Sequence, residues 1–162
     1  MSTEARPFLP ATIKLHLEDP DERDIRTIPQ LIEFDSQQNP DHVSCIQTRK
    51  HQHSISVSYL QLKKAILRCS DWFTATVKEI HLPHEDANGG LHRSSPVALA
   101  MDSDIGLLVH LLSLLGLGVP VLLLSARLSH SASRHLIPET SAEAIIGAPN
   151  IKTTMQEACI PV

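Results

Sequence analysis

The chain has few aromatic residues, few glycines and no excess of basic charge. Aromatic residues make up 3% of its 162 residues, so its hydrophobic core must be built from aliphatic side chains. Lys and Arg number 14 against 18 Asp and Glu, and the net charge of -4 argues against a nucleic-acid surface and against a polybasic membrane patch. With 42% hydrophobic residues, the chain still carries enough apolar surface to form one folded domain.

Cysteine is also scarce, and its spacing excludes the usual disulfide and zinc patterns. Cys45, Cys69 and Cys159 form an odd set without a Cys-x-x-Cys pair, which fits a reducing compartment better than a secreted disulfide framework. The first residues show neither the basic start and apolar core of a signal peptide nor an Arg-rich transit pattern. We therefore expect a cytoplasmic location.

The six glycines never form the Gly-x4-Gly-Lys pattern of a phosphate-binding loop, and Lys152-Thr153-Thr154 has no glycine-rich run before it. Gly116-Leu117-Gly118 follows a predicted helix and precedes a predicted strand. That order is the reverse of the strand-to-helix turn that directs backbone amides at phosphate. We interpret these two glycines as a turn.

Residues 1–26 are rich in Pro, Glu, Asp and Arg, and we interpret them as a flexible arm in which Ile13, Leu15 and Leu17 could form a short edge strand. A capping box of Thr27 and Gln30 then predicts a helix that ends by Asn39, before Pro40. The expected buried side of this helix consists of Leu31, Ile32 and Phe34.

Two short β-prone runs, Val43–Gln47 and Ile55–Val57, predict a hairpin with a long polar loop. Ser58 and Gln61 form a second capping box and predict a helix beginning at Tyr59. Apolar residues in steps of three and four extend this amphipathic helix to Ile80; they are Tyr59, Leu62, Ile66, Cys69, Phe73, Val77 and Ile80. Pro83 and a loop from His84 to Ser95 are expected to follow.

Beyond residue 95, short apolar runs alternate with helical patterns. The expected strands are Val97–Met101, Val119–Leu124 and Ala144–Gly147, and runs without polar alternation are typical of a covered parallel sheet. Asp102 or Ser103 would cap the first intervening helix, through Leu117, while Ser129 would cap the second, stopped by Pro138. The sequence thus predicts an α/β fold with a β-α-β-α-β parallel unit preceded by a helix, a β-hairpin and a long amphipathic helix.

A membrane span from Ile105 to Leu124 is the competing interpretation, since these twenty residues carry no formal charge apart from protonation of His110. Gly116, Gly118 and Pro120 cluster where a helix-to-strand turn is required, and this favours the α/β interpretation.

Three segments resemble a known family. Val57-Ser58-Tyr59-Leu60-Gln61-Leu62 resembles the first core motif of the adenylate-forming (AMP-binding) superfamily, from which Val57 and Gln61 depart. Pro96–Ala100 and Leu114–Ser129 resemble its second core region. The run Leu122-Leu123-Leu124-Ser125-Ala126-Arg127-Leu128-Ser129 looks most like fungal enzymes similar to nonribosomal peptide synthetases and carboxylic acid reductases.

The resemblance implies relatives that use ATP and Mg to activate a carboxylic acid as an acyl adenylate and then transfer it to a thiol. In the family, the phosphate-gripping loop, the ribose-binding acid and the catalytic lysine lie C-terminal to these motifs, and none can be matched here. No catalytic, cofactor-binding or metal residue is therefore assigned. Residues 27–150 would be an incomplete N-terminal subdomain of an adenylation domain, with 151–162 a truncated tail in which a further strand starts at Cys159.

The leading hypothesis is accordingly an N-terminal fragment of such an enzyme, inactive alone, whose partners are the missing downstream part of the domain or a carrier protein. Self-association is a further expectation, because a partial sheet leaves an edge uncovered. Two alternatives remain open: a non-catalytic α/β interaction module and a single-span membrane protein.

Individual reactive residues favour structural interpretations. The histidines at 51, 53 and 84, with Glu85 and Asp86, offer potential ligands but no His-Glu-x-x-His or Cys/His quartet, so we expect exposed histidines rather than a metal site. His110 on an apolar helix is interpreted as a partly buried imidazole with one local partner. Cys69 falls on an apolar stripe and Cys45 in a strand, so both are interpreted as packing residues rather than nucleophiles.

Overall fold

The structure, a computed structural model, describes residues 25–48, 54–77, 80–85, 91–92, 94–125 and 127–147. The expected arm at 1–26 (except residues 25 and 26) and tail at 151–162 lie outside these ranges, as does the expected strand at Cys159. The predicted β-α-β-α-β unit is confirmed. It consists of β5 (Val97–Met101), α3 (Ile105–Gly116), β6 (Val121–Ser125), α4 (His130–Glu139) and β7 (Ala144–Gly147), with the strands parallel in the order β6-β5-β7.

Both predicted capping boxes are present. In α1 (Ile28–Gln38), the Gln30 amide donates to Thr27 Oγ1 at 3.3 Å and the Thr27 amide donates to Gln30 Oε1 at 3.1 Å. In α2 (Tyr59–Thr76), Ser58 and Gln61 exchange the same two bonds at 3.4 and 2.9 Å. These reciprocal bonds satisfy amides that a helix start leaves without partners, which fixes where each helix begins.

The predicted hairpin is confirmed as an antiparallel pair of β1 (Val43–Gln47) and β2 (Ile55–Ser58). A second, short pair of β3 (His84–Glu85) and β4 (Leu91–His92) occupies a region that was expected to be a loop. Two residues per strand are too few to produce a recognisable alternation, so the sequence carried no signal for this pair.

The long helix is shorter than predicted, because α2 ends at Thr76 rather than Ile80. Val77 adopts an extended backbone with φ -98 and ψ 92, and it follows the β-branched Thr76. Val77 and Ile80 nevertheless pack against the same apolar cluster as Phe73. The apolar spacing therefore continued past the helix end because residues beyond the helix also reach this core.

Other boundaries also differ from the expectations. Asp104, not Asp102 or Ser103, caps α3; β6 begins at Val121 because the Val119 amide still donates to the Leu114 carbonyl in the preceding turn. Pro138 lies inside the last turn of α4 and does not stop it.

The predicted burial of Leu31 on α1 is wrong, since 44% of this residue is exposed. No helix within the described ranges is long and apolar enough to span a membrane, and α3 has only 12 residues.

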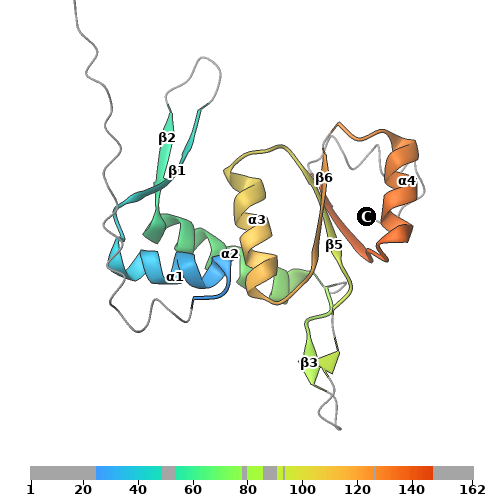
Figure 1. Ribbon diagram of the computed structural model, residues 1–162, viewed down its shortest axis with the longest axis horizontal. Helices are drawn as coiled ribbons and strands as arrows, with labels where there is room; N and C mark the ends of the chain where they lie inside the picture. The colour runs from blue at the N-terminus through green and yellow to red at the C-terminus, as the bar shows by residue number, and fades with distance from the viewer. Residues whose placement is uncertain are drawn as a thin grey trace, which may run out of the picture.

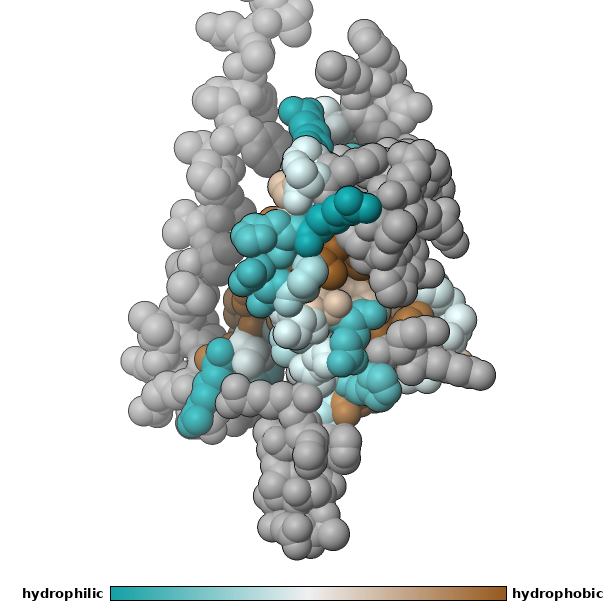
Figure 2. Space-filling model, turned by 90° about the vertical axis from the view of Figure 1, so that its right-hand side faces the viewer, coloured by the Kyte–Doolittle hydropathy of each residue, from teal (hydrophilic) through white to brown (hydrophobic). Residues whose placement is uncertain are grey.

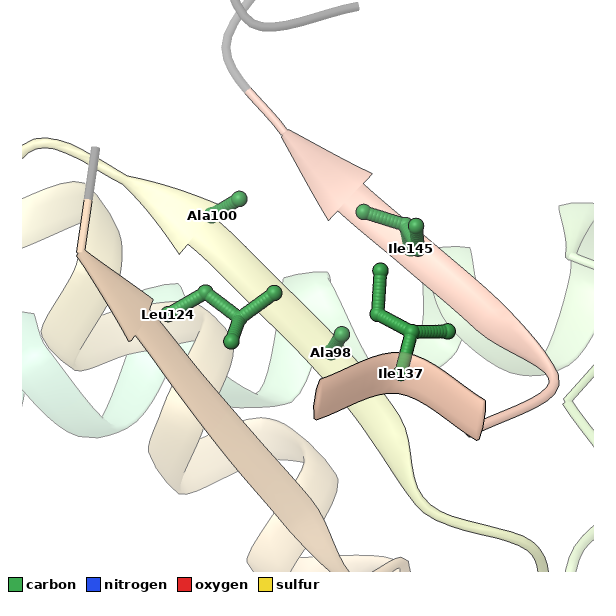
Figure 3. Close-up of a cluster of buried hydrophobic side chains, with 5 residues drawn as sticks. All are labelled: Ala98, Ala100, Leu124, Ile137 and Ile145. Carbon is green, nitrogen blue, oxygen red and sulfur yellow. The ribbon is translucent and has the colours of Figure 1, made fainter. Parts of the chain in front are cut away.

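The parallel sheet lies between two helical layers, with α3 on one face and α4 on the other (Figure 1). On the α4 side, the small residues Ala98 and Ala100 of β5 meet Leu124, Ile137 and Ile145 (Figure 3). On the α3 side, Val97 and Leu99 of β5 pack with Phe73 of α2, Leu114 of α3 and Val119 of the turn before β6. The outer surface around α4 is mainly polar, with apolar side chains visible between the polar ones (Figure 2).

The α2–α3 contact is held by a buried hydroxyl as well as by apolar packing. Ser113 is 0% exposed, and its Oγ lies 3.0 Å from the Ile66 carbonyl of α2 and 2.7 Å from the Val109 carbonyl of its own helix. Because the side chain is small, the two helices can approach closely while the hydroxyl remains hydrogen-bonded. On the outer side, the ion pair of Lys63 and Glu33 links α2 to α1.

Replacement of Phe73 by Ala should remove the largest side chain of the core on the α3 side. Phe73 is 1% exposed, and loss of a buried Phe costs about 3–5 kcal/mol. Urea denaturation followed by circular dichroism would measure this loss. Leu67→Ala on the same helix is the matched control, because Leu67 is 52% exposed and its truncation should change the free energy of unfolding by less than about 0.5 kcal/mol. Equal effects at both positions would contradict the described core.

The Glu33–Lys63 pair should make stability depend on pH. The Lys63 side chain, by hydrogen bonding, lowers the pKa of Glu33. A carboxyl whose pKa is lowered on folding stabilises the protein above its ordinary pKa, and this contribution is lost as the pH falls through the lowered value. Glu33→Gln should thus destabilise the protein at neutral pH by less than about 1 kcal/mol, since the pair is exposed, and have no effect once the carboxyl is protonated. In a Lys63→Gln background, Glu33→Gln should have a smaller effect at neutral pH, because only the hydrogen bond from Gln37 to the carboxylate then remains.

Candidate functional site

A hollow of about 500 Å³ opens at the carboxyl ends of β5 and β6, beside the start of α3. Its lining residues come from the two strand ends, from α3 and from the turn after β6; they are Met101, Asp102, Ser103, Leu107, Leu123, Leu124, Ser125 and Arg127. The carboxyl ends of parallel strands are where open α/β sheets bind ligands. This hollow is therefore the candidate site within the described residues.

The strand order places the hollow beside the topological switch point rather than at it. The chain leaves β5, crosses through α3 to β6, and returns through α4 to β7 on the other side of β5. The crevice between diverging connections therefore lies between β5 and β7, whereas the hollow lies between β5 and β6. Topology alone does not assign a ligand to it.

The polar groups of the hollow are suited to binding a ligand rather than to covalent catalysis. Asp102, Ser103, Ser125 and Arg127 are exposed, and the Ser125 hydroxyl already accepts the Arg127 amide at 3.2 Å. Apolar side chains of Leu107, Leu123 and Leu124 form the rest of the wall. These lining residues include no histidine to serve as a general base and no cysteine nucleophile.

The N-terminus of α3 is capped by the side chain of Asp104. Asp104 Oδ1 accepts the Leu107 amide at 3.0 Å, so the carboxylate takes the place that a bound phosphate would occupy at a free helix N-terminus. A side chain at Gly106 would place its Cβ 2.9 Å from the same oxygen, so glycine lets the carboxylate reach the amide. The sequence interpretation missed Asp104, although an Asp immediately before the first apolar residue of a helical pattern is a recognisable cap.

The residues singled out from the sequence do not gather at this hollow. His110 Nδ1 lies 2.7 Å from the Gly106 carbonyl, and its ring meets Phe73 edge-on, so the expected structural role with one local partner is confirmed. Gly118 has φ +75 in the turn between α3 and β6, which confirms the turn interpretation for this residue, whereas Gly116 is the last residue of α3. His51, His53 and Asp86 lie outside the described residues, as do Lys152 and Cys159.

Both described cysteines are partly buried. Burial raises the pKa of the Cys69 thiol, so it stays protonated at neutral pH and packs beside Phe73 as expected. Cys45 is half-buried in β1. His81 Nδ1 lies 3.6 Å from Glu143 on an exposed surface. Within the described ranges, no three His, Cys, Asp or Glu side chains are grouped so that they could hold a metal ion.

Three curated relatives match most of this chain but only a small part of their own length, although no family model matches it. An adenylate-forming reductase of Aspergillus terreus is 38% identical over 164 aligned residues, covering 98% of this chain and 15% of the relative. The adenylate-forming reductase stbB of Stachybotrys bisbyi is 32% identical, covering 90% and 13%. A non-ribosomal peptide synthetase of Acremonium egyptiacum is 31% identical, covering 83% and 12%.

Solved structures share the fold at low sequence identity. The fatty acyl-adenylate ligase of Legionella pneumophila, in complex with acyl adenylate and pyrophosphate, matches 88% of this chain with a TM-score of 0.66 and 13% identity. The N-terminal domain of FACL13 from Mycobacterium tuberculosis matches 82% with a TM-score of 0.64 and 14% identity. The chain covers 24% and 29% of those two chains. The shared part is thus one section of a larger adenylating fold.

Replacement of Gly106 by Ala should show that helix propensity and the Asp104 cap have opposite effects on stability at the start of α3. Alanine favours helix by about 1 kcal/mol over glycine, but here its Cβ would displace the Asp104 cap, whose loss costs about 0.5–2 kcal/mol. Gly106→Ala should therefore give little or no net stabilisation. In an Asp104→Ala background, the same change should stabilise by about 1 kcal/mol. Thermal unfolding of the four variants would measure this coupling, and additive effects would contradict the described cap.

Proposed function

The chain belongs to the adenylate-forming superfamily, as a homologue of fungal adenylate-forming reductases, and on that premise we propose that it supplies the first α/β layer of an adenylation domain and is inactive alone. In this proposal, residues 27–150 are an incomplete N-terminal subdomain. The remainder of such a domain would provide the ATP and acyl sites. The chain itself would act in the cytoplasm, as expected for an odd number of cysteines without a Cys-x-x-Cys pair.

The observation that carries the proposal is the limited extent of the match. The chain is aligned over 98% of its own length to a relative of which it covers 15%. Its sequence has no Gly-x4-Gly-Lys loop, and the family's Ser/Thr/Gly-rich phosphate loop and catalytic lysine cannot be matched. The cap of α3 supports the same conclusion, since Asp104 repels anions from a helix start that could otherwise have bound phosphate.

Partners follow from the same proposal. One solved match is an artificial fusion of an adenylation domain with a PCP from Klebsiella oxytoca, and this chain covers 20% of it. The remaining part of an adenylation domain is the first partner that we propose, and a carrier protein is the second. Cofactors would enter only in the assembled domain, where relatives are expected to use ATP and Mg.

Acid-dependent exchange of pyrophosphate into ATP should be absent for the purified chain with any carboxylic acid. The positive groups and amides that stabilise phosphoryl charge are worth several kcal/mol in such reactions, and the sequence cannot supply a matched set. The control is the full-length Aspergillus terreus relative assayed in parallel. Robust exchange by the chain alone would overturn the proposal.

A non-catalytic interaction module is the second candidate, and the hairpin of β1 and β2 favours it. Its residues Val43, Ile46 and Ile55 are 45%, 60% and 47% exposed, and the hairpin extends away from the helices (Figure 1). A two-stranded ribbon with exposed apolar side chains is marginal alone and gains stability from a partner surface. A specific protein partner lost on Ile46→Lys, combined with inactivity in the exchange assay, would select this candidate.

A further inference from the structure

We draw no further inference here: the strongest candidate, the hollow at the carboxyl ends of β5 and β6 with Asp102, Arg127 and the exposed Leu123 in its wall, is open only among the described residues, and nothing in the structure shows what covers or occupies it.

Discussion

Complete burial of β5 on both faces is the constraint on which the other elements depend. Ala98, Leu99 and Ala100 are each 0% exposed, so every peptide group of this strand must be paired within the sheet and every side chain must meet a helix. β6 and β7 satisfy the peptide groups, and α3 and α4 cover the faces. The alternation of alanine with larger residues also makes the two faces different, because Ala98 and Ala100 pack on the α4 side while Val97 and Leu99 pack with residues of α2 and α3.

The order of elements could be predicted because the relevant signals are local. Each capping box needs only a hydroxyl and an amide three residues apart, and a buried parallel strand needs only a short apolar run. The end of α2 could not be predicted in this way. Val77 and Ile80 contact the core from beyond the end of the helix, and their spacing alone cannot distinguish that from another helical turn. Tertiary packing decided the boundary.

The candidate hollow was less predictable than the fold, because its residues come from separate segments. The turn after β5, the first turn of α3 and the end of β6 meet only after the two strands pair in register. Sequence reasoning predicted a turn at Gly118, one local partner for His110 and apolar packing for Cys69, and the structure has each residue in that place. Asp104 was missed because Asp102 and Ser103 are equally good capping residues in isolation.

The central position of β5 also determines an order of assembly. Val97 pairs with Val121 on one side and with Ala144 on the other, so the second pairing closes a loop about twice as long. Each doubling of a loop adds about 0.6 kcal/mol of closure entropy, and distant contacts form later in folding. The half with α3 and β6 is therefore expected to form first. Until α4 and β7 arrive, the alanine face of β5 is open, so a chain emerging during synthesis carries a half-covered sheet that other chains can reach.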